Sequence, residues 1–302
     1  MSDGPGLINW LLLAILGFIW GTSFLGVSVA LEGFGPFTIA AARIAIGAML
    51  LTAVAFASGH GLPGRATATD RRVWLHCLGF ALFTNAIPFT LLGWGQLRVP
   101  SGFAGISMAV VPLFVLPLAF FILREPLTVR RLAGFLLGFC GVVILIGPGA
   151  LLSGDNDLVF WAKLACVGAS LCYATGSMVT RTAPPVPLQS YSAAGLIISS
   201  CMIVPLALWV EGVPRVEWGV PLLAVLYLGV FPTAIATVML VRVINSAGPT
   251  FMSLVNYQVP IWAVINGMLI LDEDLPPSFL TALVLILSGL ALSQARGVRF
   301  RA

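Results

Sequence analysis

SMAVVPLFVLPLAFFILREPLT, at residues 107–128, is the stretch that decides the fold of this chain. It is apolar from Met108 to Leu123 and then becomes charged at Arg124 and Glu125. Its residues do not alternate between apolar and polar, as they would in a strand of a membrane β-barrel. Together with the small and apolar residues before it, the block reaches the roughly 20 residues that a helix needs to cross a bilayer. It therefore predicts a membrane-spanning α-helix over residues 101–123.

The rest of the chain has the same character. Of the 302 residues, 59% are hydrophobic and 9% are charged, whereas soluble domains contain about 25% charged residues. Most of the chain therefore cannot face water, and only short polar gaps separate its apolar blocks. We expect an all-α polytopic membrane protein with ten spans, at residues 10–30, 36–57, 73–96, 101–123, 129–148, 158–180, 188–210, 218–241, 249–271 and 277–295.

The basic residues predict how these spans are oriented. If the N-terminus lies in the cytoplasm, only Arg98, Lys163 and Arg215 lie toward the outside, and Arg43 lies within a span. The remaining basic residues then face the cytoplasm, as the positive-inside rule requires. We therefore expect an inner-membrane protein with both termini in the cytoplasm, whose positive net charge reflects topology rather than nucleic-acid binding. The residues on the cytoplasmic side are Arg65, Arg71, Arg72, Arg124, Arg130, Arg131, Arg181, Arg242, Arg296, Arg299 and Arg301.

The opening stretch has a second copy at a constant offset of 148 residues, VNYQVPIWAVINGMLILDEDLP at residues 255–276. At this offset Pro112 aligns with Pro260 and Glu125 with Glu273. We therefore divide the chain into two repeats, residues 1–150 and 151–302, of five spans each. Because five is an odd number, the second repeat enters the membrane from the opposite side. Inverted repeats of this kind are typical of secondary transporters, with the substrate near the midplane between the halves.

Further motifs support this interpretation: IWGTSF at residues 19–24 and PFTIAAAR at residues 36–43. With the two copies of the opening stretch, they resemble the EamA-type branch of the drug/metabolite transporter superfamily. The resemblance implies ten helices around a central cavity and transport, often export, of amino acids, metabolites or toxic organic compounds. Among these substrates we favour amino acids, as in the aromatic amino-acid exporters of the YddG type. Export of lipophilic or cationic drugs is the alternative.

Arg43 is the first candidate for substrate binding, because it lies about seven residues, or roughly 10 Å, into the second span. A charge at this depth costs a few kcal/mol unless it is paired, reaches the surface or faces a wet cavity. One interpretation is an anchor for a substrate carboxylate. The other is a structural arginine that caps carbonyl groups of a neighbouring helix, and the sequence leaves both open.

Other candidates share a helical face or an aromatic character. On span nine, small and polar residues recur on one face, with aromatic residues beside them. Ordinary helix packing in lipid uses the same small residues, so each of these positions has that second interpretation. The full set of expected cavity residues is Trp20, Phe24, Arg43, Asn85, Tyr173, Ser253, Asn256, Tyr257 and Trp262, and the expected kinks or hinges are Pro88, Pro112, Pro232 and Pro260. Glu125 and Glu273 stand at span ends, where we expect them to cap the following helix.

Motifs for other functions do not occur. The sequence has no HExxH, no convincing G-x-S-x-G, no P-loop, no cluster of His and Asp, and no CxxC among its five cysteines. We therefore expect a secondary carrier rather than an intramembrane enzyme, without metal or cofactor. Its expected partners are a small-molecule substrate and the lipid bilayer. A channel would need a filter-like loop or a ring of charges, neither of which is evident.

Overall fold

The computed structural model describes residues 6–147 and 158–294, and within these ranges all regular structure is helical. Nine helical segments of the described chain are long and apolar enough to cross a membrane. They correspond to nine of the ten expected spans. The helices are α1 (Leu7–Ala30), α2 (Pro36–Ala57), α3 (Ala68–Phe80), α4 (Ile87–Gln96), α5 (Ser101–Met108), α6 (Val111–Leu123), α7 (Val129–Ile146), α9 (Leu158–Arg181), α10 (Leu188–Val210), α11 (Val220–Leu228), α12 (Ala236–Ala247), α13 (Pro249–Met252), α14 (Val255–Ile270) and α15 (Pro277–Gln294).

The remaining expected span is span nine, at residues 249–271. It is present as α13 and α14, and it is interrupted at Ser253 and Leu254. Span four is interrupted in a similar way between α5 and α6, at Ala109 and Val110. Spans three and eight each contain a π-helical segment, η1 (Ala81–Ala86) and η2 (Gly229–Ile235), which joins α3 to α4 and α11 to α12. These irregular segments loosen the regular hydrogen-bond ladder in the middle of a span, and π-helices often mark functional sites.

Two features of the backbone recur at the offset found in the sequence. The π-helices begin at Ala81 and Gly229, which are 148 residues apart. The other pair is Arg124 and Asp272, the two non-glycine residues with positive φ in the described chain, at 54° and 50°. Since 272 minus 124 is also 148, the same left-handed turn ends span four at one membrane face and span nine at the other.

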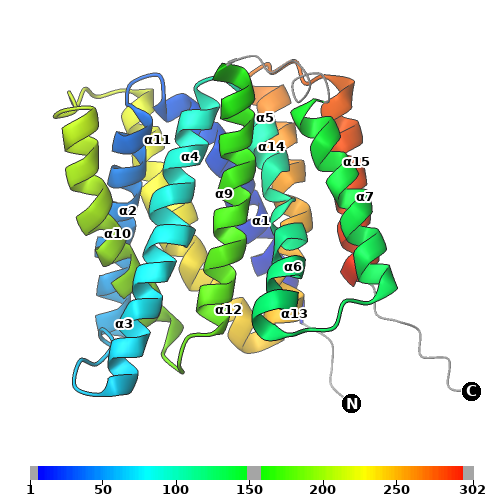
Figure 1. The fold of residues 1–302 in the computed structure, drawn as a ribbon. Coiled ribbons are helices and arrows are strands. Elements are labelled where there is room, and N and C mark those ends of the chain that lie inside the picture. Colours follow the sequence, from blue (N-terminus) through cyan, green and yellow to red (C-terminus); the bar gives the residue numbers. More distant parts are fainter. Residues whose placement is uncertain (1–5, 148–157, 295–302) are drawn as a thin grey trace, which may run out of the picture.

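The bundle has two opposite ends, which we call faces and name by where the described chain begins and ends. The terminal face is where α1 begins and α15 ends, and the distal face is opposite (Figure 1). The helix α1 passes through the middle of the bundle and packs against α14, α11 and α12. Two antiparallel pairs, α2 with α10 and α7 with α15, lie at opposite sides of it (Figure 1). Large apolar side chains such as Phe121 and Trp209 point outward, as expected of a surface that faces lipid.

Candidate functional site

Arg43 lies on α2 and is 6% exposed. The central carbon of its guanidinium group lies 3.8 Å from the centre of the Phe89 ring on α4, a cation–π contact. The Nε and Nη2 atoms both donate to the hydroxyl of Thr233, each at 3.4 Å. These hydrogen bonds are long, and they share one oxygen atom, although a guanidinium group has five N–H donors. The nearest protein groups therefore use only a small part of the capacity of Arg43 to donate hydrogen bonds.

No carboxylate of the described chain pairs with Arg43. The ion pairs found there join Glu125 to Arg181 at 2.8 Å and to Arg131 at 3.6 Å, both near the terminal face. A buried cation without an acidic partner is unusual, because removal from water costs free energy that an opposite charge normally offsets. Arg43 is thus a buried positive charge aimed at neutral groups, which is the arrangement expected where an anion is to bind.

The π-helix η2 supplies the groups that hold Arg43 and its surroundings. Thr233 accepts from Arg43 and also donates to the carbonyl oxygen of Leu228 at 2.8 Å, five residues earlier. The indole N–H of Trp20 on α1 donates to the carbonyl oxygen of Pro232 at 3.1 Å. Spans one, two and eight therefore meet at this segment through hydrogen bonds between α1, α2 and η2.

Further aromatic side chains lie near the guanidinium group. The rings of Phe89 and Tyr173 lie 6.4 Å apart, and Tyr227 stacks on Phe231 at 5.4 Å. Both tyrosines lie close enough to Arg43 to interact with it electrostatically. We name the group of Trp20, Arg43, Phe89, Tyr173, Tyr227 and Thr233 the Arg43 cluster. It combines one cation, several hydroxyl groups and flat apolar surfaces, contributed by both halves of the chain.

Of the nine expected cavity residues, the cluster contains Trp20, Arg43 and Tyr173. Phe24 is buried in the main hydrophobic core, and the amide of Asn85 donates to Phe80 O in its own span at 3.4 Å. The hydroxyl of Tyr257 donates to Gln294 of α15 at 3.2 Å. Trp262 packs edge-to-face on Phe18 of α1, while Ser253 lies in the interruption of span nine and the half-buried Asn256 in the first turn of α14.

The four prolines differ in their effect on the helices. Pro88 is near the start of α4 just after η1, Pro112 follows the interruption between α5 and α6, and Pro232 lies inside η2. Pro260 lies inside the continuous helix α14, whereas its span is interrupted earlier, at Ser253 and Leu254. The expected kinks or hinges at Pro112 and Pro260 stay a prediction, and the chain breaks close to Pro112 but not at Pro260. A proline removes one hydrogen bond, and neighbouring helices can hold the helix together across that gap.

Two important cluster residues, Thr233 and Tyr227, did not emerge from the sequence. Thr233 could have been found through the repeat, since it is 148 residues after Asn85. Both side chains donate to a carbonyl group five residues earlier, Asn85 to Phe80 and Thr233 to Leu228. They therefore occupy equivalent places in the two π-helices. Tyr227 carries no such signal.

The glutamates contact partners other than the expected ones. Glu273 does not cap the following helix, because its carboxylate accepts from the backbone N–H groups of Ser101 and Gly102, at 2.5 and 2.9 Å. Glu125 forms the ion pairs described above, and the helix after it is capped by Thr128. The expectation of local capping was wrong for both, since the left-handed turn before each glutamate points its side chain back toward other spans.

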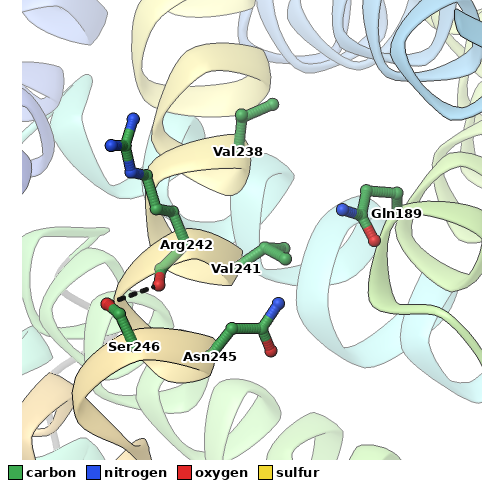
Figure 2. A pocket seen from close by; sticks show the side chains of 6 residues that line it. All are labelled: Gln189, Val238, Val241, Arg242, Asn245 and Ser246. Carbon is green, nitrogen blue, oxygen red and sulfur yellow. Dashed lines mark hydrogen bonds between the residues drawn. The ribbon is translucent and has the colours of Figure 1, made fainter. Parts of the chain in front are cut away.

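A pocket of about 420 Å³ lies between α10 and α12 near the terminal face. Figure 2 shows Gln189 of α10 facing the side chains of α12 across it. The α12 residues that line it are Val238, Val241, Arg242, Asn245 and Ser246. Val238 comes five residues after Thr233, about 7.5 Å along a helix. The pocket therefore lies on the terminal side of the Arg43 cluster, beside the same span that carries Thr233.

Comparison with known proteins agrees with this architecture. The chain matches the EamA-like transporter family over residues 8–147 and 160–294. The uncharacterized transporter YvbV of Bacillus subtilis (strain 168) is 25% identical over 98% of this chain and 94% of its own length. The uncharacterized inner membrane transporter YedA of Escherichia coli (strain K12) is 26% identical over 84% of this chain and 80% of its own length.

The fold itself occurs in a solved crystal structure that is 22% identical, with a TM-score of 0.66 over 95% of this chain and 96% of that chain. The family match covers both halves of the chain, and the relatives are named as transporters rather than enzymes. This chain therefore belongs to the EamA-like transporter family of the drug/metabolite transporter superfamily, and it is a multi-pass membrane protein.

Proposed function

We propose that this protein is a secondary carrier that moves a small organic solute with a carboxylate group, an amino acid or a related metabolite, across the inner membrane by alternating access. Arg43 binds the carboxylate. The observation that carries this proposal is a buried guanidinium group without an acidic partner in the described chain, at the meeting point of several spans. A carboxylate offers two oxygen atoms that match the guanidinium fork.

The structural interpretation of Arg43 is weaker. An arginine that stabilises the fold by capping a helix would donate to backbone carbonyl groups. The hydrogen bonds of Arg43 in the described chain both go to the one hydroxyl of Thr233, at long distance. The side chain therefore gains little from its protein partners relative to the cost of burying its charge.

The aromatic residues of the cluster favour a solute with an apolar part. Phe89, Tyr173 and Trp20 offer flat apolar rings in the cluster, which suits the side chain of an amino acid such as phenylalanine. These surfaces also favour the second candidate, export of lipophilic drugs. A cationic drug fits poorly, because Arg43 would repel it at close range.

The orientation follows from the distribution of arginine. Arg65, Arg71, Arg72 and Arg124 lie at the ends of spans on the terminal face, so this face is cytoplasmic by the positive-inside rule. A relative named as an inner membrane transporter supports the inner membrane as the location. The pocket between α10 and α12 then opens to the cytoplasm. Entry of solute from this side suits export.

The test is counter-flow in proteoliposomes that are preloaded with amino acids, with labelled phenylalanine, threonine or a cationic dye outside. We expect saturable uptake of an amino acid by the unchanged protein and at least a hundredfold loss in Arg43→Ala. Arg98→Ala is the matched control, because Arg98 also lies over an aromatic ring, that of Trp94, but is exposed. Equal uptake by Arg43→Ala and the unchanged protein would refute the role of Arg43. Uptake of the dye alone would replace amino acids with drugs as the substrate class.

A further inference from the structure

Spans four and nine approach each other only in part. The distal half of span four, α5, packs along α14, whereas its terminal half, α6, packs on α9. The contact of α5 with α14 is close: a Cβ atom added to Gly105 would lie 2.1 Å from the Cβ atom of Ala263. The two spans are thus closed against each other at the distal face, where Figure 1 shows α5 and α14 side by side.

Glu273 lies at the end of this contact. It follows α14 in the chain, and its carboxylate accepts from the first two backbone N–H groups of α5, those of Ser101 and Gly102. The unpaired N–H groups and the dipole at the start of a helix favour a negative charge. This contact ties the end of span nine to the start of span four, across the two halves of the chain.

Three polar atoms near the distal ends of their spans are buried and have no hydrogen-bond partner within the described residues. They are Nε2 of Gln96 at the end of α4, Oγ of Ser101 at the start of α5, and Nδ2 of Asn266 near the end of α14. Their residues are 8%, 1% and 7% exposed. A buried donor without a partner is costly and rare in a state that a protein always occupies. Water would satisfy these atoms if the distal face opened.

The equivalent glutamate at the terminal face is in a different state. Glu125 is 148 residues before Glu273, and its backbone N–H donates to Ala119 O at 3.3 Å, just as that of Glu273 donates to Gly267 O at 3.0 Å. Glu125 and Glu273 therefore follow the same type of backbone turn at the ends of spans four and nine. The side chain of Glu125, however, pairs with the exposed Arg181 and leaves the spans at that face apart.

We propose that Glu273 is a latch that holds the distal exit of the transport path closed, and that Gln96, Ser101 and Asn266 line this exit when it opens. The inference rests on the proposed carrier function and adds the position of its outer gate. When the carrier changes to the conformation that is open at the distal face, Glu273 releases the start of α5. The three polar side chains then become accessible to water.

The experiment measures access to one of these side chains from each face. Asn266→Cys is introduced into a protein whose five native cysteines are replaced by alanine, and it is labelled with a charged maleimide that does not cross membranes. Right-side-out and inside-out vesicles report the distal and terminal faces separately. We expect slow labelling in this background and at least a tenfold faster reaction from the distal face alone when Glu273→Gln or Glu273→Ala is added.

Two further variants keep the test specific. Glu125→Gln removes the equivalent carboxylate at the terminal face, so it should not accelerate distal labelling. Gly267→Ala keeps the charge of Glu273 but places a methyl group 2.3 Å from its Oε2 atom, so it should accelerate distal labelling as Glu273→Gln does.

Unchanged distal labelling in the Glu273 variants would overturn the latch. Equal acceleration from both faces, with a lower melting temperature, would overturn it as well, because it would show a plain structural cap. The assay needs no substrate, so its failure leaves the role of Arg43 standing, and loss of that role leaves the latch standing.

Discussion

Replacement of Arg43 by methionine separates the two interpretations of this residue, because they predict changes of stability in opposite directions. Methionine is unbranched, flexible and apolar, so it can fill the place of the arginine stem beside Phe89 without a charge. If Arg43 serves the substrate, Arg43→Met stabilises the empty protein and strongly weakens substrate binding. If Arg43 serves the fold, the variant is less stable.

The magnitude follows from the contacts of Arg43. An arginine near the centre of a membrane helix costs about 3 kcal/mol. The cation–π contact with Phe89, 3.8 Å from guanidinium carbon to ring centre, offsets about 1–2 kcal/mol of this cost. The two long hydrogen bonds to one hydroxyl add about 0.5 kcal/mol. About 1 kcal/mol of unfavourable free energy remains. We therefore expect Arg43→Met to be more stable than the unchanged protein by about this amount.

The loss of binding should be much larger than this gain. A bidentate, charge-assisted pair of hydrogen bonds contributes about 3 kcal/mol, and about 1.4 kcal/mol corresponds to a factor of ten in affinity. The affinity for an amino acid should therefore fall by a factor of about 150.

Thermal unfolding in detergent, with and without the amino acid that is transported, measures both quantities. We expect a slightly higher melting temperature for Arg43→Met alone and no further rise when the amino acid is added. A variant destabilised by more than about 2 kcal/mol, the size of a lost structural hydrogen-bond network, would refute our reasoning.

Three other substitutions test single contacts. Thr233→Val removes the hydroxyl that holds Arg43 and should weaken amino-acid uptake about fivefold, the effect of about 1 kcal/mol, while Thr233→Ser should retain uptake. Gly134→Ala places a methyl group 2.5 Å from the carbonyl oxygen of Gly289, so the α7–α15 pair should separate and the protein should lose about 2 kcal/mol of stability. The control is Ala133→Leu at an exposed position, which should leave the melting temperature within a degree or two of the unchanged protein. Glu211→Gln weakens the contact of that carboxylate with the start of α2. It should lower stability by about 1 kcal/mol and leave uptake kinetics unchanged. Slower uptake at equal stability would contradict a purely structural role.

The spans themselves could be predicted from sequence because a bilayer leaves helices little choice. Apolar length predicted span two as residues 36–57 and span four as residues 101–123, and the structure has the same ends. Span three begins earlier than expected, at Ala68, because a capping box of Thr67 and Asp70 starts the helix before its apolar part. Such differences arise where a helix extends beyond the membrane, since there its ends depend on capping rather than on hydropathy.

The site could be predicted only in part. Arg43 stood out because a charge within an apolar span is visible in one dimension. That Phe89, Tyr173 and Thr233 are its neighbours could not be predicted, because they are separated from it by 46 to 190 residues in sequence. Which side of each helix meets Arg43 depends on rotations and crossing points that packing sets, and residues of equal polarity elsewhere, such as Tyr257, contact another helix.

The sequence alone therefore predicted the spans, and the ends of those that stop at the membrane surface, because both follow from the free-energy cost of placing polar groups in lipid. Only the tertiary structure decided that Arg43 has a hydroxyl rather than a carboxylate as its neighbour. It also decided that Glu273 and Glu125, which share one local motif, contact a helix start at one face and an arginine at the other. Local sequence gives these two residues the same turn, and the unequal approach of spans four and nine at the two faces gives them different partners.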